Sequence, residues 1–301
     1  MARLPVRTLT LNPSIDVASE TDKVEPERKV RTCCERIDPG GGGINVARVL
    51  DRLGVGVEAL FLAGGATGKA FDELLGRSSL ARRPIWIADD TRTSLTVHEK
   101  SGAEYRFVPE GPTISAKELE ACREAIAATP CDYFVASGSL PPGVPDDFYG
   151  SVAALAREQG AQFVLDTSGP ELKAAVDRGG IALLKVSKEE FDRPAAAGLV
   201  ASGRVEQVTM TLGSEGALLI SGDGTFFLPA LATEPVSTVG AGDSFLAGMT
   251  YGLVSGLGPA EAFRIAVAAG AAATLSEGTD LAYPDNVWRL LDQVPPPGRI
   301  D

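Results

Sequence analysis

Residues 238–248 of the chain read TVGAGDSFLAG, and this stretch decides how the rest of the sequence is interpreted. The small residues at 240–242 let the backbone approach a ligand closely and point several N–H groups at one spot. The apolar run after them predicts a helix over 245–253, whose N-terminus adds partial positive charge there. Such a spot suits a phosphoryl group in transfer, with Asp243 accepting a hydroxyl proton. A plain tight turn with an aspartate in the first helical turn is the alternative.

A second glycine-rich segment lies far upstream, where residues 39–47 read PGGGGINVA. Four glycines before a predicted helix over 43–53 again allow close approach of the backbone to a ligand. Asn45 offers both a donor and an acceptor to sugar hydroxyls. The segment is not a Walker A loop, because no Lys-Ser/Thr pair follows, and it does not fit GxGxxG before a nearby acidic residue. A flexible hinge is the equal alternative.

Two further polar positions follow predicted strands, where a parallel sheet places its ligand. Asp16 comes just after the first strand, and its carboxylate can accept hydrogen bonds from two vicinal hydroxyls. Residues 137–143 read SGSLPPG, so that Gly138 and Ser139 can line the floor of a cleft. An exposed turn aspartate and a rigid strand-ending turn are the corresponding alternatives.

Four basic residues lie in or beside two irregular segments: Lys29, Arg31, Arg92 and Arg106. Arginine forks match phosphate oxygens well, so we favour Arg92 and Arg106 over the other two. A solvated position on the surface is the alternative for each.

Short apolar runs alternate with helical stretches along the whole chain. The predicted strands cover residues 6–11, 59–63, 133–137, 162–166, 182–186 and 207–212, and helices at 116–127 and 147–159 join those at 43–53 and 245–253. Strands separated by helices predict a single α/β domain over residues 1–301, with a mostly parallel sheet and helices on both faces. Residues 15–37 and 84–108 alternate polar and apolar positions, and they predict a small antiparallel sheet over one end of the main sheet.

Composition excludes several classes of function. The 301 residues include 28 Lys plus Arg and 40 Asp plus Glu, and the net charge of −12 argues against non-specific nucleic-acid binding. Four cysteines without CxxC spacing indicate neither a disulfide framework nor a structural zinc site. A single histidine, His98, makes histidine-centred catalysis improbable. No signal-peptide core or membrane-length apolar run is visible, so we expect a cytoplasmic protein.

Together, the segments TLTLNP at 8–13, GGGGINVAR at 40–48 and TVGAGDS at 238–244 resemble the phosphofructokinase B family of ribokinase-like sugar kinases. Within that family the pattern is most similar to the minor bacterial 6-phosphofructokinases, with 1-phosphofructokinases and tagatose-6-phosphate kinases as close relatives. The resemblance implies a ribokinase-like three-layer sandwich with a β lid. It also implies transfer of the ATP γ-phosphoryl group, with Mg²⁺, to a phosphorylated ketohexose, first of all fructose 6-phosphate, and a homodimer formed through the lid.

The resemblance also implies a role for each matching residue. It implies that Asp243 is the catalytic base and that Gly240, Ala241 and Gly242 form the anion hole. The residues implied to bind the sugar hydroxyls are Asp16, Gly41 and Asn45, and those implied to bind the sugar phosphate are Lys29, Arg92, Arg106 and Ser139. The residues implied to bind the nucleotide are Lys185, Ser187, Thr211, Gly213 and Gly216, and the implied metal ligand is Glu190.

One segment departs from the family pattern, which is Lys-Pro-Asn with a glutamate three residues after the asparagine. Here residues 185–190 read KVSKEE, so Ser187 stands where asparagine is expected. The stretch from Glu190 to Leu212 is also shorter than in close relatives, which predicts a truncated helix. We therefore expect reduced or shifted kinase activity. A weakly active sugar-phosphate or nucleotide-binding protein is the alternative. A kinase of an unphosphorylated sugar or nucleoside is disfavoured by the basic residues.

Overall fold

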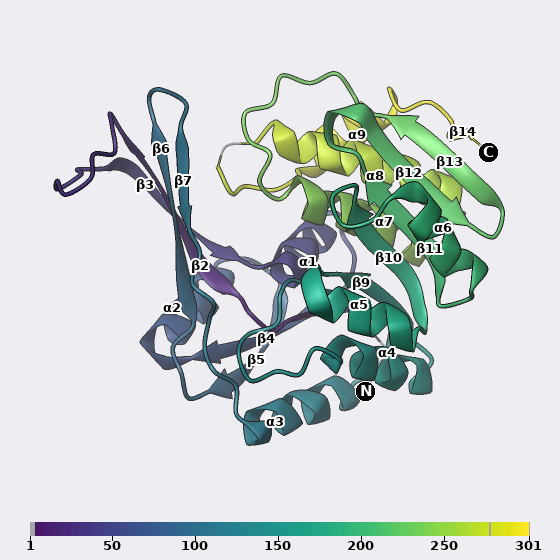
Figure 1. The fold of residues 1–301 in the computed structure, drawn as a ribbon, viewed down its shortest axis with the longest axis horizontal. Coiled ribbons are helices and arrows are strands. Elements are labelled where there is room, and N and C mark those ends of the chain that lie inside the picture. The colour runs from purple at the N-terminus through teal and green to yellow at the C-terminus, as the bar shows by residue number, and fades with distance from the viewer. Residues whose placement is uncertain (1–3, 277, 301) are drawn as a thin grey trace.

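The computed structural model describes residues 4–276 and 278–300, and a ten-stranded sheet runs through its centre (Figure 1). The strands, in chain order, are β1 Leu4–Thr10, β4 Val57–Gly64, β5 Ala81–Ile87, β8 Cys131–Ser137, β9 Gln162–Asp166, β10 Ile181–Ser187, β11 Val205–Thr211, β12 Gly216–Ser221, β13 Gly224–Pro229 and β14 Gly298–Arg299. Their spatial order is β14-β13-β12-β11-β10-β9-β8-β1-β4-β5. Neighbours from β5 to β11 pair in parallel, and β12 to β14 add an antiparallel edge.

Helices cover both faces of this sheet and give the molecule three layers. One face carries α1 Gly42–Arg52, α2 Gly65–Leu75, α7 Ala241–Val254, α8 Pro259–Thr274 and α9 Pro284–Leu291. The other carries α3 Ala116–Ala127, α4 Phe148–Glu158, α5 Gly169–Arg178 and α6 Arg193–Ala201. Successive side chains of a strand point to opposite faces of the sheet and therefore pack against both helical layers. In β4, Phe61 packs into the core on the first face, and Leu60 and Leu62 pack into the core on the second. The predicted α/β class is confirmed, and no helix in the described part of the chain is long and apolar enough to cross a bilayer.

A second sheet of four strands stands away from the main body as a lid (left side of Figure 1). It contains β2 Ser14–Thr21, β3 Cys33–Gly40, β6 Arg92–Glu99 and β7 Glu104–Phe107, in the order β3-β2-β6-β7. An antiparallel hairpin joins β6 to β7.

Two details of the lid differ from the prediction. The second lid segment begins at Arg92 rather than at residue 84, because Pro84–Ile87 belong to β5 and pair in parallel with β4 in the main sheet. The central pair of the lid, β2 with β6, is parallel and not antiparallel. Each of these strands follows a parallel strand of the main sheet, β1 and β5, and therefore enters the lid from the same edge in the same direction.

The register of the lid separates two faces. Val17 is aligned with Ile37 on one side and with Leu95 on the other, and Leu95 is aligned with Phe107, so an apolar row crosses all four strands. Ile37, Leu95 and Phe107 are 49%, 38% and 57% exposed. The opposite face carries the alternate, mostly polar positions, which include Asp16 and Arg106.

Candidate active site

The two glycine-rich segments meet where α1 and α7 begin. Asn45, in the first turn of α1, donates a hydrogen bond from Nδ2 to Oδ2 of Asp243 at 2.8 Å, although the two residues are 198 positions apart. Both helices start from a glycine at positive φ: Gly41 at 118° and Gly240 at 74°. A side chain is disfavoured in that backbone region, which explains the glycines at both positions. The structure thus brings together the two signatures that the sequence singles out.

Asp243 has the electrostatic properties of a general base. Burial raises its pKa to about 6, the Asp166 carboxylate and Asp16 act in the same direction, and the Asn45 hydrogen bond and Lys185 oppose them. A carboxylate with this pKa is ionised at neutral pH and is still basic enough to accept a hydroxyl proton.

A lysine lies beside the glycine turn before α7. Lys185 of β10 is 3.1 Å from Oδ1 of Asp166 at the end of β9, and a methyl group added to Gly242 would lie 3.3 Å from its Nζ. Burial lowers the pKa of Lys185, but the carboxylates of Asp166, Asp243 and Glu190 outweigh this effect and raise it overall. The ammonium group therefore stays charged next to the helix N-terminus, and together they form a site for an anion.

Asp166 was not among the predicted site residues. It is the last residue of a predicted strand and its only charged residue, so its place at the carboxyl edge of the sheet was available as a signal.

The lid contributes an acid and two arginines to the opposite wall of the site. Ser14 donates a hydrogen bond to Asp16, whose pKa is raised by burial, while the hydrogen bond and the charges of Arg92 and Arg106 act against that rise. Arg106 is on the same face of the lid and forms an ion pair with Glu104 at 3.5 Å. The structure therefore brings Asp16, Arg92 and Arg106 together as the sequence predicts.

Arg92 is held in a fixed orientation. Its terminal nitrogens donate to the carbonyl oxygens of Pro109 at 2.9 Å and Asn12 at 2.8 Å. Its Nε is buried and has no hydrogen-bond partner in the described chain. Since an unpaired buried donor is costly, this atom is suited to an anionic ligand.

Ser139 lies at the same end of the sheet, just after β8. Asn12 donates from Nδ2 to Ser139 Oγ at 3.3 Å and to the carbonyl oxygen of Glu110 at 2.8 Å. Asn12 is 4% exposed and its Oδ1 has no partner among the described residues. Sequence reasoning missed this residue, although it precedes Pro13 in the turn that ends the first strand.

Lys29 is the predicted site residue that the single chain does not bring to the cluster. It is exposed in the loop between β2 and β3, beyond Thr21 at the far end of the strand. Thr21 is five positions after Asp16 along the strand, a span of about 17 Å.

A cavity of about 740 Å³ lies on the other side of the glycine turn. Its lining includes the predicted nucleotide residues Thr211, Gly213 and Gly216, and it reaches Ala241 and Gly242. Apolar side chains complete the wall, among them Leu231, Phe245 and Val267. The volume is in the range of pockets that hold ligands of nucleotide size.

Residues 185–190, the segment that departs from the family pattern, contain a local hydrogen-bond network. Ser187 donates to Oε2 of Glu190 from its backbone N at 2.7 Å and from Oγ at 3.0 Å. The helix that follows, α6, has nine residues, so it is short rather than missing. An oriented carboxylate next to the anion site fits Mg²⁺, which prefers oxygen ligands and often takes one or two carboxylates together with substrate phosphates.

Comparisons with known proteins agree with this geometry. Residues 8–286 match the model of the pfkB family carbohydrate kinases. The chain is 40% identical to ATP-dependent 6-phosphofructokinase isozyme 2 of Mycobacterium tuberculosis, over 97% of this chain and 91% of that protein. It is 37% identical to the isozyme 2 of Escherichia coli K12, over 95% and 97%. The structure of Escherichia coli phosphofructokinase-2 in complex with fructose-6-phosphate superposes with a TM-score of 0.90 at 35% identity, over 97% and 99%.

Proposed function

The chain belongs to the pfkB family of carbohydrate kinases, and from this premise we propose that it transfers the γ-phosphoryl group of ATP to fructose 6-phosphate. The products are fructose 1,6-bisphosphate and ADP. The observation that carries the proposal is the Asp243 carboxylate, bonded to Asn45 and poised beside the glycine turn and Lys185. The matched relatives named as 6-phosphofructokinases support the choice of sugar phosphate.

The chemistry follows from these positions. Asp243 accepts the proton of the sugar hydroxyl while the hydroxyl oxygen forms a bond to the γ-phosphorus and the bond to the β-phosphate oxygen breaks. The N–H groups at the start of α7 and the Lys185 ammonium stabilise the negative charge that spreads over the phosphoryl oxygens. Alignment of the two reactants across this point supplies much of the rate.

The sugar phosphate is proposed to bind between the lid and the start of α1. Asp16 and Asn45 accept and donate hydrogen bonds to sugar hydroxyls, with Gly41 giving close backbone approach. Arg92, whose Nε has no partner among the described residues, binds the phosphate with help from Arg106. Ser139 completes this group.

ATP is proposed to occupy the cavity beyond the glycine turn, where Thr211, Gly213 and Gly216 contact the nucleotide. Glu190, oriented by Ser187, would hold Mg²⁺. When bound, Mg²⁺ neutralises part of the phosphate charge.

The lid is proposed to join two copies of the chain. In its apolar row, Ile37, Leu95 and Phe107 are exposed, while Val17 packs partly against the main core. A small sheet with an uncovered apolar face is marginal alone. A second copy of the same face covers this row with a matching surface. The contact of Lys29 with the sugar phosphate and the cytoplasmic location stay predictions.

The decisive experiment is detection of ADP with a panel of acceptors. Fructose 6-phosphate is expected to give the highest kcat/KM among fructose 6-phosphate, fructose 1-phosphate, tagatose 6-phosphate and unphosphorylated fructose. A preference for fructose 1-phosphate or tagatose 6-phosphate would reassign the substrate within the family. Tight binding of sugar phosphates without turnover would instead favour a binding protein, a second candidate that Ser187 in place of asparagine motivates.

A further inference from the structure

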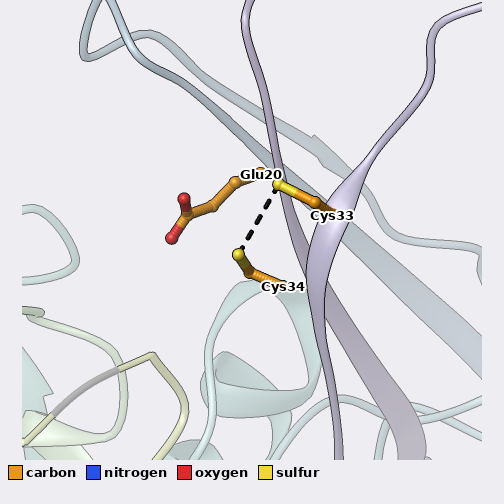
Figure 2. Close-up of side chains that lie close together, drawn as sticks. All are labelled: Glu20, Cys33 and Cys34. Carbon is orange, nitrogen blue, oxygen red and sulfur yellow. Dashed lines mark hydrogen bonds between the residues drawn. The ribbon is translucent and has the colours of Figure 1, made fainter.

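We infer that Glu20, Cys33 and Cys34 bind one thiophilic divalent cation of the zinc class on the lid, four residues along β2 from Asp16 and on the same face of the sheet. In residues 4–276 and 278–300, this is the one group of three or more potential metal ligands whose donor atoms all lie within 4.8 Å of one another. Figure 2 shows the two sulfur atoms and the carboxylate gathered at one place. Two thiolates and a carboxylate are ligands that zinc accepts, and a site with three protein ligands keeps a fourth position for water.

Adjacent cysteines in a regular strand do not form such a pair, because successive side chains point to opposite faces. Cys34 breaks that alternation with a φ of 56°, in the left-handed region. The β2–β3 ladder is also irregular here, with a shift of register between Ala18 and Glu20. As a result the two sulfur atoms are 3.5 Å apart. Two thiolates on one tetrahedral zinc lie at a similar separation, about 3.8 Å for Zn–S bonds of about 2.3 Å.

The third ligand comes from the neighbouring strand. Glu20 of β2 is aligned with Cys33 of β3, and all three side chains are exposed to solvent. Glu20 is three residues after Val17 in the regular ladder between β2 and β6. Its side chain therefore points to the face of the lid opposite the apolar row. A cation bound there leaves the apolar face free for the second copy of the chain.

Bound metal would connect the two strands at the base of the loop over residues 22–32. Because Glu20 and Cys33 lie on opposite sides of this loop, a shared cation restricts the movement of both ends. Slower amide hydrogen exchange in residues 22–32 is therefore a consequence that does not depend on kinase activity.

The test is titration of the reduced, full-length protein with Cd²⁺, a spectroscopic probe for zinc-class thiolate sites, in the absence of ATP and sugar phosphate. We expect one equivalent to bind, with an ultraviolet thiolate-to-cadmium band of two sulfur ligands that Zn²⁺ displaces. Cys33→Ser and Cys34→Ser each should halve the band and weaken binding by at least about tenfold. Glu20→Gln should keep the band and weaken binding, whereas Glu35→Gln, an exposed neighbour on β3, should match the unsubstituted protein.

Several results would overturn the inference. A band that persists in the Cys33→Ser/Cys34→Ser double variant would come from the buried Cys122 and Cys131. No saturable binding, or Glu20→Gln behaving like Glu35→Gln, would remove the site as described. Loss of two hydrogens in the mass spectrum under mild oxidation, together with no binding of Cd²⁺ by the reduced protein, would identify the two cysteines as a redox pair instead. All substitutions are at exposed positions, and an unchanged melting temperature without metal verifies the fold.

Discussion

Asp243 is a single residue whose ionisation controls the proposed reaction. Its pKa of about 6 means that kcat/KM should fall as the pH drops below about 6, because the protonated carboxyl accepts no proton. Asp243→Asn should lower kcat by roughly 10²–10⁴-fold, the usual contribution of a general base. The measurement is a pH profile of ADP formation for both proteins. A variant that retained most of its turnover would exclude Asp243 as the base.

The same residue lowers the stability of the folded protein at neutral pH. A raised pKa means that the folded state binds the proton more tightly than the unfolded state. The contribution of Asp243 to stability is therefore largest below pH 3.8, and this contribution is lost as the pH rises through about 6. Asp243→Asn should therefore increase the free energy of unfolding at pH 8, by up to about 3 kcal/mol. Chemical denaturation measures this, with the exposed turn residue Asp223→Asn as control. Equal stability of the two variants would contradict the electrostatic account.

At the scale of elements, the turn that starts α7 leaves no room for a side chain at Gly240. Gly240 has a φ of 74°, and a methyl group there would collide with the side chain of Leu281. Gly256, which follows the same helix, has a φ of 75° and no atom within 4 Å of such a methyl group. Both Gly240→Ala and Gly256→Ala should lose about 1–2 kcal/mol of stability from the backbone. Only Gly240→Ala should also lose turnover, by about tenfold or more, because the anion-binding N–H groups shift.

Comparison of denaturation midpoints and kcat for the two variants separates these effects. Equal turnover in both variants would show that the position of the turn does not matter for transfer.

The end of β10 gives a second prediction at this scale. Ser187 holds Glu190 through two hydrogen bonds, but it lacks the amide of the asparagine that the family pattern has. Ser187→Asn should raise turnover by about threefold to tenfold, the effect of one added hydrogen bond near the phosphates. Ser187→Ala, which loses the Oγ bond and keeps the backbone bond, should lower it. Steady-state kinetics with MgATP as the varied substrate test both, and unchanged or reduced turnover in Ser187→Asn would remove the idea.

At the scale of the whole molecule, three residues of the lid's apolar row, Ile37, Leu95 and Phe107, face solvent in the single chain. Leu95→Asp or Phe107→Asp should convert a dimer into a monomer, because a charge placed in a covered apolar contact is strongly unfavourable. Leu257→Asp replaces a side chain of similar exposure, 41%, away from the lid and should leave the dimer intact. Sedimentation at micromolar concentration is the measurement. An unsubstituted protein that sediments only as a monomer would refute the proposed assembly.

The sequence by itself determined the order of elements and the segments that meet at the site. The local periodicity of apolar residues predicts buried strands and amphipathic helices. For this reason the helix predicted at 116–127 agrees with α3, and the strand predicted at 162–166 agrees with β9. The glycines at 41 and 240 are likewise local signals, because each allows a backbone conformation that a side chain disfavours.

Only the tertiary structure decided which groups from distant parts of the chain lie close together and which do not. The Asp166–Lys185 pair, the parallel pairing of β2 with β6 and the distance of Lys29 from Asp16 depend on how separate segments leave the main sheet. The approach of the Cys33 and Cys34 sulfurs depends on one left-handed residue in an irregular ladder, against the alternation that the sequence pattern predicts. Contacts of this kind arise from packing and register between segments, which local periodicity does not encode.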